Sequence, residues 1–493
     1  MKNVISWLAC IVLLAGCGGG SSSPPTYTVS GTIDHLSSSG LALTNGTTTL
    51  SIASGATSFA FPDQLPDGTA FQISVASQPA GENCVVAQSG GVVAAANVST
   101  VDVQCNTAIS SPTGLGIYPV ATGPDGFSHA YVPVTMVGNV PVSINATVDT
   151  GSSGVVLNAL DIFPSSMVTV DGFTSPPGVS YPEGIKTVSY NGITVTNIVV
   201  QTYLNAEGSG NNGNATSNYT NTPGVFAYGN IGYAQVSFGE NGSMTTAVIP
   251  VLLVFKTLNP DGAALPSSLT TNIFGINPSI APFYKEYQRR APGLQTCDTA
   301  PSTSFVCGLV SPLRSLTYAS NVDPGYVLKP FSLQTCDIGT PGSCKPVASL
   351  QVGVNEAAKV GFTSFDLSCQ TLKSLLVGAP SMNICDQTVS PSTLSFAGNS
   401  TVTGVIVNTG NSGMIMGTGG VAGFPATIAV GTPISVTMGP SFNYTFTAGT
   451  GNFATTVGTP PTLIRPGPTD IGIGFFSTHS MFVDYTAGTE GWL

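Results

Sequence analysis

One short pattern occurs twice in this chain of 493 residues, and its second copy has an amide in place of the acid of the first. The first copy is Val148-Asp149-Thr150-Gly151-Ser152-Ser153-Gly154, and the second is Val407-Asn408-Thr409-Gly410-Asn411-Ser412-Gly413. Apolar residues flank both copies, and the glycines permit a tight turn between two strands. The pattern therefore predicts two strand–turn–strand loops, each of which presents one polar side chain, Asp149 or Asn408, at the end of a strand.

A second element follows each loop. Two apolar residues and a glycine occur at Ile273-Phe274-Gly275, and a similar run, Asp470-Ile471-Gly472, occurs near the C-terminus. Taken in order, these elements resemble the pepsin-like aspartic proteases, in which each of two lobes supplies an acid loop and an apolar–glycine strand. The segments 130–137 and 140–146 resemble the hairpin that precedes the first acid loop in that family. The resemblance also leads us to expect a helix over 281–290.

The resemblance implies an all-β architecture with a bilobal pepsin-like β domain. We expect the first lobe to span 108–325 and the second lobe to span 326–493. Asp149 and Asn408 then occupy the two positions of the catalytic pair. The supporting residues implied by the family are Thr150, Gly151, Ser152, Thr409 and Gly410.

Family members also carry a tyrosine on a hairpin that covers the cleft. Tyr228, in the segment 226–233, is the candidate in this chain. The competing interpretation is a strand aromatic that packs against the core. The sequence leaves both interpretations open.

Asn408 sets the chemistry of the predicted site. The family reaction needs two carboxyls that share one proton, and a carboxamide exchanges no proton in the working pH range. Donation from Asn408 to Asp149 would stabilise the charged carboxylate, so we expect Asp149 to titrate with a low pKa. Asp470 and Asp484 are conceivable replacement acids, but their sequence surroundings favour turn-capping at strand ends away from the loops.

Three functions follow as alternatives. The first is a catalytically impaired aspartic-peptidase-like domain that binds an extended peptide or other polymer between its lobes. The second is an active acid endopeptidase of the aspartic type. The third is a structural surface protein without a ligand, in which the loops only join the lobes.

The N-terminus predicts export and a lipid anchor. A short apolar stretch follows Lys2 and ends at Leu14-Ala15-Gly16-Cys17, which resembles the lipobox of bacterial lipoproteins. We therefore expect a signal peptide over 1–16, acylation of Cys17 and a flexible Gly/Ser/Pro tether over 17–26. The alternative is an ordinary signal peptide with a chance cysteine. The residue after the cysteine is Gly18, as in lipoproteins that are sent on to an outer membrane. We therefore expect the protein in the bacterial cell envelope, anchored in the outer membrane.

The segment 27–107 predicts a separate β module. Alternating runs occur at 27–33, 71–75 and 99–105, and Asn45-Gly46 is a hairpin signal. Many short strands with one cysteine pair are typical of a small β-sandwich. The segment resembles the Ig-like modules of bacterial surface lipoproteins, in which it serves as a spacer.

Composition excludes several partners. Charged residues make up only 7% of the chain, with 12 Lys and Arg against 23 Asp and Glu, so a nucleic-acid-binding surface is not expected. With three histidines and no Cys-x-x-Cys beside them, no metal and no other cofactor is expected. We expect a monomer whose partners are the membrane, through its lipid, and a peptide or polymer ligand.

Cysteine usage predicts disulfides. Cys10 falls in the signal peptide and Cys17 is the lipidation site, which leaves an even set in an oxidising compartment. Connectivity does not follow from sequence alone, and local spacing favours four bridges. These are Cys84–Cys105, Cys297–Cys307, Cys336–Cys344 and Cys369–Cys385.

Overall fold

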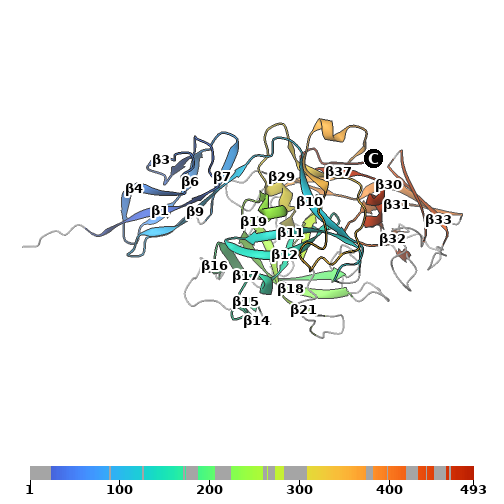
Figure 1. The fold of residues 1–493 in the computed structure, drawn as a ribbon, viewed down its shortest axis with the longest axis horizontal. Helices are drawn as coiled ribbons and strands as arrows, with labels where there is room; N and C mark the ends of the chain where they lie inside the picture. Colours follow the sequence, from blue (N-terminus) through green and yellow to red (C-terminus); the bar gives the residue numbers. More distant parts are fainter. Residues whose placement is uncertain are drawn as a thin grey trace, which may run out of the picture.

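A computed structural model shows a chain built almost entirely of β-strands (Figure 1). It describes residues 24–87, 90–124, 127–169, 172–173, 187–205, 224–258, 264, 272–282, 308–372, 381–396, 398–417, 431–439, 441–448, 462–465 and 468–493. Only the backbone is described at 83, 85, 87, 197–199, 201–205, 224–226, 282, 415 and 462–465. In these residues the strands are joined by turns and short 3-10 segments, so the all-β prediction is confirmed.

The N-terminal module has its own core (Figure 1, blue). One sheet has the order β4-β1-β9-β7, and a second has the order β3-β2-β6. Apolar side chains from both sheets, among them Ile33 and Leu43, form one buried cluster, as expected for a β-sandwich. The strands are β1 (Thr26–Asp34), β2 (Ala42–Thr44), β3 (Thr49–Ser51), β4 (Ser58–Pro66), β5 (Ala70–Gln72), β6 (Ser74–Ser77), β7 (Glu82–Ala87), β8 (Gly90–Val92) and β9 (Val98–Thr107).

A large sheet runs from the first lobe into the second. Its order is β16-β17-β18-β21-β13-β22-β12-β11-β10-β26-β25-β37-β38-β27. The predicted hairpin before the first loop is confirmed as β11 (His129–Val137) and β12 (Val140–Asp149). The other strands are β10 (Thr113–Val120), β13 (Ser153–Asn158), β16 (Thr187–Tyr190), β17 (Ile193–Asn205), β18 (Gly224–Ala234), β21 (Ile249–Leu258), β22 (Ile273–Ile276), β25 (Asp323–Leu328), β26 (Val347–Val354), β27 (Thr363–Asp366), β37 (Met481–Asp484) and β38 (Thr489–Trp492).

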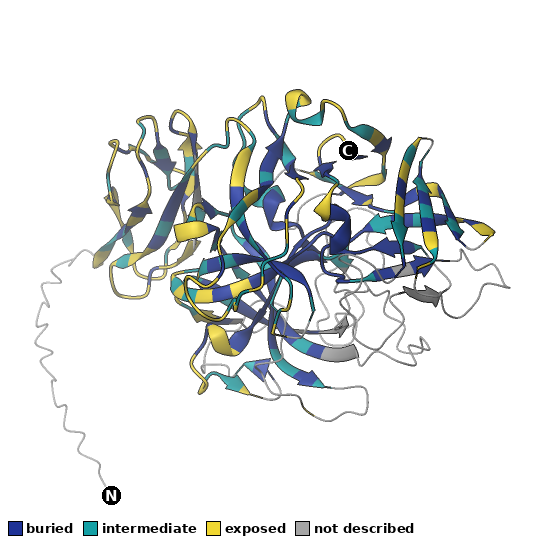
Figure 2. Ribbon diagram, turned by 45° about the vertical axis from the view of Figure 1, so that its right-hand side comes forward, coloured by how far each residue is buried: buried dark blue, intermediate teal, exposed yellow. Residues whose placement is uncertain are grey.

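The second lobe adds a sheet of order β34-β33-β30-β31-β36-β32-β35. Its strands are β30 (Val389–Phe396), β31 (Asn399–Val407), β32 (Met414–Gly417), β33 (Pro433–Met438), β34 (Phe442–Thr447), β35 (Thr462–Arg465) and β36 (Thr469–Ile471). Figure 2 shows buried residues concentrated in the strands at the centre of the molecule and exposed residues on the outlying turns.

The two lobes repeat one strand arrangement around their loops. In the first lobe, β12 pairs in parallel with β22, β22 pairs antiparallel with β13, and β13 pairs in parallel with β21. In the second lobe, β31, β36, β32 and β35 repeat these three pairings with the same directions. Each apolar–glycine strand therefore lies between the strand that enters a loop and the strand that leaves it, which fixes both loops against the core.

Three of the four predicted disulfides are present. They join Cys84 to Cys105, Cys336 to Cys344 and Cys369 to Cys385. The fourth, Cys297–Cys307, lies outside the described residues, as do the signal peptide, Cys17 and most of the tether. The bridge Cys369–Cys385 links the paired strands β28 (Ser368–Leu372) and β29 (Met382–Asp386), so it stabilises a local hairpin.

Two expectations about helices can be compared with the structure. Ala281 belongs to a strand, β23 (Ile280–Pro282), and so the predicted helix does not begin there, while 283–290 lie outside the described residues. Across the described part of the chain, no helix is long and apolar enough to cross a membrane.

Candidate active site

The two predicted loops meet at residues 149–152 and 408–411, which we call the loop junction. Thr150 donates its hydroxyl hydrogen bond to the Val407 carbonyl at 2.8 Å, and Thr409 donates to the Val148 carbonyl at 2.6 Å. Each hydroxyl also accepts from the other loop, because Thr409 N–H donates to Thr150 Oγ1 at 2.9 Å and Thr150 N–H donates to Thr409 Oγ1 at 3.0 Å. Both threonines are fully buried, so these four hydrogen bonds join the loops away from water.

Asp149 ends β12 and lies at the centre of the loop junction. Its Oδ1 accepts from the Gly151 N–H at 2.8 Å, and its Oδ2 accepts from the Ser152 hydroxyl at 2.5 Å. Only 5% of the residue is exposed. The structure therefore places Ser152 where the family resemblance implied, beside the first acid.

Burial changes the acidity expected for Asp149. Loss of solvation raises the pKa of this carboxyl, and the hydrogen bonds from Ser152 and Gly151 and the field of His129 only partly oppose that effect. The prediction of a low pKa was wrong, because it considered hydrogen bonding to the carboxylate and not the cost of burying its charge.

Asn408 occupies the matching place in the second loop. Its Oδ1 accepts from the Gly410 N–H at 2.8 Å, which leaves the amide nitrogen Nδ2 turned the other way. Each loop's glycine makes room for the other loop's polar side chain. A methyl group at Gly151 would overlap the Asn408 amide, and one at Gly410 would overlap the Asp149 carboxyl.

The structure brings a third polar side chain to the loop junction. Asn408 Nδ2 donates to Asp470 Oδ2 at 3.2 Å, and Asp470 is 4% exposed. Asp470 lies in the middle of β36, between β31 and β32. The prediction that Asp470 caps a turn away from the loops was wrong, because β36 passes directly beside the strand that ends at the second loop.

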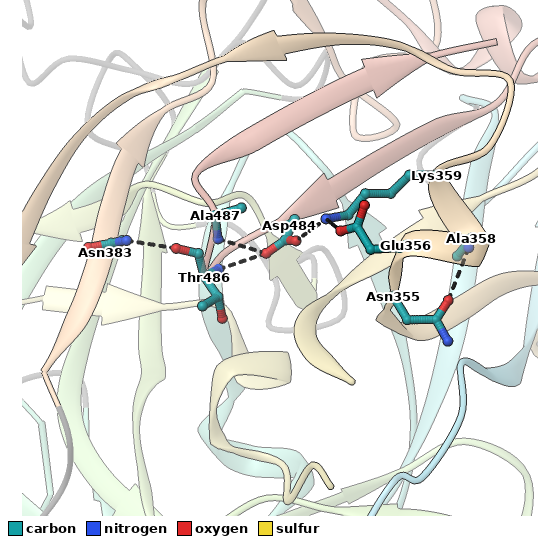
Figure 3. A network of polar contacts seen from close by, with 8 residues as sticks. All are labelled: Asn355, Glu356, Ala358, Lys359, Asn383, Asp484, Thr486 and Ala487. Atoms are coloured by element: carbon teal, nitrogen blue, oxygen red, sulfur yellow. Dashed lines mark hydrogen bonds and ion pairs between the residues drawn. The ribbon is translucent and has the colours of Figure 1, made fainter. Parts of the chain in front are cut away.

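Asp484 behaves as predicted (Figure 3). It ends β37, and its Oδ1 accepts from the backbone N–H groups of Thr486 and Ala487 at 2.9 Å each. Its Oδ2 forms an ion pair with Lys359 Nζ at 2.7 Å, and Lys359 also pairs with the exposed Glu356. Asp484 is thus a turn-capping residue.

A buried polar layer supports the loops from beneath. Asn277 Nδ2 donates to the Thr150 carbonyl at 3.0 Å and also to Gln387 Oε1. Gln387 Nε2 donates to the Val407 carbonyl at 3.4 Å.

Glu490 is a fully buried acid next to this layer. It accepts a hydrogen bond from the Trp492 indole at 2.9 Å and interacts with Gln387. Its burial raises its pKa to about 8. The sequence showed no signal for this layer, because its members come from segments far apart in the chain.

Tyr228 lies within β18, opposite Gln201 of β17 and Lys256 of β21. Its ring is half-buried, with Lys256 Nζ 4.9 Å from the ring centroid, which is a cation–π contact. This position suits a strand aromatic. The tip of the β17–β18 hairpin lies outside the described residues, so a covering role for Tyr228 stays a prediction.

The geometry defines what the loop junction can do chemically. Asp149 can accept a proton, Asn408 can donate hydrogen bonds without exchanging a proton, and Asp470 adds a second carboxyl next to Asn408. In the described residues, no group of three or more His, Cys, Asp or Glu side chains is placed to hold a metal ion.

Comparison with solved structures gives many similar chains, one of which is an aspartic proteinase. The aspartic proteinase from Irpex lacteus aligns with 76% of this chain and 96% of its own, with 12% sequence identity and a TM-score of 0.41. No protein-family model matches the chain, and no curated protein matches it by sequence. A likeness at this identity and TM-score says nothing about the chemistry of this chain.

Proposed function

We propose that this chain is an envelope-anchored lipoprotein whose aspartic-peptidase-like domain binds an extended peptide, or a similar polymer, at the loop junction. The observation that carries the proposal is the reciprocal hydrogen bonding of Thr150 and Thr409. These bonds hold Asp149 and Asn408 together in a fixed frame. A carboxylate and an amide side by side offer one acceptor and one donor, which is the combination that a peptide backbone requires.

Hydrolysis by the two loop residues alone is impaired in this proposal. Asp149 can remove a proton from water, but Asn408 cannot supply or accept the second proton that a pair of carboxyls exchanges. The loop frame is retained while one acid is replaced, which favours binding as the role of the Asp149–Asn408 pair.

Anchoring follows from the N-terminus. The segment 1–16 is proposed as the signal peptide, Cys17 as the acylated residue, and the N-terminal module as a spacer that holds a monomeric peptide-binding domain away from the outer membrane. The composition of 17–26, which is rich in Gly, Ser and Pro, supports a flexible tether.

Peptide binding is tested with a labelled statine-type peptide and purified protein, titrated between pH 3 and 7. Binding that is weakened at least tenfold in Asp149→Leu, and retained in a surface control such as Asp366→Asn, is the expected result. Failure of the parent protein to bind any member of a statine-peptide set would reject the proposal. Mass spectrometry of the N-terminal peptide, with Cys17→Ser as control, tests the lipid anchor separately.

A second candidate function is an acid endopeptidase. The position of Asp470 favours this function. Its carboxyl lies 3.2 Å from the Asn408 amide nitrogen and supplies the second half of the site with a group that can exchange a proton. This candidate requires peptide binding as well, so the two functions differ only in the fate of the bound peptide.

A further inference from the structure

The position of Asp470 is unusual within the repeat that relates the two lobes. In the first lobe Asp149 lies opposite Gly275 and Thr147 lies opposite Ile273. In the second lobe Val407 lies opposite Ile471 and Ile406 lies opposite Asp470. Because Asn408 corresponds to Asp149, Asp470 corresponds to Ile273. A carboxyl therefore stands where the other half of the same fold has an apolar side chain.

The two halves also support their loop side chains in opposite ways. In the first lobe a hydroxyl donor, Ser152, bonds the Asp149 carboxylate. Asn411 holds the corresponding place in the second lobe, but its Oδ1 accepts from the Gly413 N–H. The polar partner of Asn408 is Asp470, which accepts a hydrogen bond from the Asn408 amide. The acid that is missing at 408 is thus present one side chain away, on the neighbouring strand.

Burial makes this pair of carboxyls chemically significant. Asp149 and Asp470 are both almost fully buried; Asp149 belongs to the loop junction, and Asp470 accepts a hydrogen bond from Asn408 of that junction. Two buried carboxyls at one site favour a single negative charge, because a second ionisation would add charge to a poorly solvated region. One carboxyl is then a base while the other still holds a proton.

We propose that Asp470 is the relocated second acid of this site, and that peptides bound at the loop junction are hydrolysed with Asp149 as base and Asp470 as acid. The inference rests on the proposed peptide binding and goes beyond it by assigning a reaction and its second acid. Asn408 donates one amide hydrogen bond to Asp470.

The reaction consumes one water. Ionised Asp149 removes a proton from the water as the water oxygen bonds to the scissile carbonyl carbon, and the carbonyl π electrons move onto the carbonyl oxygen. The second N–H of the Asn408 amide donates to that oxygen. When the carbon–nitrogen bond breaks, the nitrogen keeps the electron pair and takes the proton of Asp470, while the carbonyl reforms. The proton on Asp149 returns to Asp470 through solvent, and the products are a carboxylic acid and an amine.

Four variants test this assignment with an unfolded protein as substrate, at pH 2–7. Asp470→Asn keeps the shape of the side chain but exchanges no proton, and Asp470→Ile reproduces the residue of the first lobe. Asp149→Asn shows whether any cleavage comes from this site and not from a contaminant. Asp366→Asn, an exposed acid on β27, is the matched surface control.

The expected result is slow acid-range cleavage by the parent and by the surface control. In Asp470→Asn and Asp470→Ile the rate should fall by a factor of about 10²–10⁴, the range typical of a lost general acid. Binding of the statine-type peptide should persist in Asp470→Asn, and the melting temperature of each variant shows whether it is folded. The limb of the pH profile that depends on a protonated acid should disappear with Asp470.

Two results would overturn the inference. One is cleavage by Asp470→Asn at the parental rate and with the parental pH profile. The other is a parent protein that binds the statine-type peptide but cleaves nothing across the pH range, which would leave the proposed binding function intact. Loss of peptide binding by the parent would instead reject the proposed function itself, so the two failures are distinguishable.

Discussion

Thr150 and Thr409 are separated by 259 positions in the sequence, yet each donates its hydroxyl to a carbonyl of the other's strand and accepts the other's backbone N–H. The four hydrogen bonds have lengths of 2.6–3.0 Å and are fully buried. They relate the two loops symmetrically, and this symmetry fixes the relative position of Asp149 and Asn408.

Thr150→Val should destabilise the protein by about 1–3 kcal/mol for each buried group that it leaves unpaired. The Thr409 N–H loses its partner, and the Val407 carbonyl keeps the longer hydrogen bond of 3.4 Å from Gln387, while the volume of the side chain is kept. Denaturant unfolding measures the loss. Thr150→Ser, which retains the hydroxyl, is the control, and equal stability of the Val and Ser variants would contradict this account.

In the Asp470→Ile background, Asn408→Asp should increase acid-range cleavage of unfolded protein by a factor on the order of 10²–10⁴, since it restores a proton-exchanging group in the second loop. Asn408→Asp alone should cleave at least as fast as the parent, because both carboxyls are then present. Steady-state cleavage with a statine-type inhibitor as control measures both. Mass spectrometry of the peptide that contains Asn408 must first exclude deamidation in the parent. A folded Asn408→Asp variant without cleavage would show that the loop junction cannot position water.

Glu490 should make stability depend on pH. Its folded pKa is raised to about 8, whereas an exposed glutamate has a pKa of about 4.3. Unfolding lets the carboxyl ionise, so the free energy of unfolding contributed by this group is greatest below about pH 4.3 and falls as the pH rises to about 8, by up to about 1.4 kcal/mol per pH unit.

Glu490→Gln should flatten that slope. Urea unfolding of the parent and the variant at pH 5, 6, 7 and 8 gives the comparison. Burial also raises the pKa of Asp149, so this residue adds a slope of the same sign to the pH dependence of stability. Because Asp149 is present in both the parent and the variant, the difference between their slopes reports Glu490 alone. Parallel slopes would show that Glu490 is ionised in the folded protein.

Lys359 forms ion pairs with one buried acid, Asp484, and one exposed acid, Glu356 (Figure 3). The two pairs allow the stability contributed by a buried ion pair to be compared with that of an exposed one. Lys359→Met leaves the fully buried Asp484 carboxylate without its cation and should cost about 3 kcal/mol of stability. Glu356→Gln removes the pair with a carboxylate that is 91% exposed and should cost less than about 1 kcal/mol. Equal losses in thermal unfolding would contradict the assignment of the ion-pair energy to burial.

Local patterns in the sequence were sufficient for the frame of the site. The two loops, the hairpin before Asp149 and three disulfides each depend on residues close together in the chain, where turn chemistry and alternation are informative. The separate N-terminal β module was also predictable. Its Asn45-Gly46 turn is longer than a two-residue hairpin, however, because Asn45 Oδ1 caps the N–H groups of Thr47 and Thr48.

The contact between Asn408 and Asp470 was not predictable from either segment alone. It depends on β36 pairing with β31, and in isolation an acid before an apolar–glycine pair resembles a strand-end residue. One signal was present. Aligning the two apolar–glycine strands on their glycines places Asp470 at the position of Ile273, and a carboxyl in place of a partly buried apolar residue is unexpected without a partner.

Gly151 of the first loop packs against the Asn408 amide, and Gly410 of the second loop packs against the Asp149 carboxyl. Each loop therefore shapes the space that holds the polar side chain of the other loop. The surface against which each polar side chain packs includes the glycine backbone of the opposite loop. A side chain added to either glycine would displace the working group of the opposite half. A substitution at either glycine therefore acts first on the opposite half of the site, so the two halves are coupled through these two contacts.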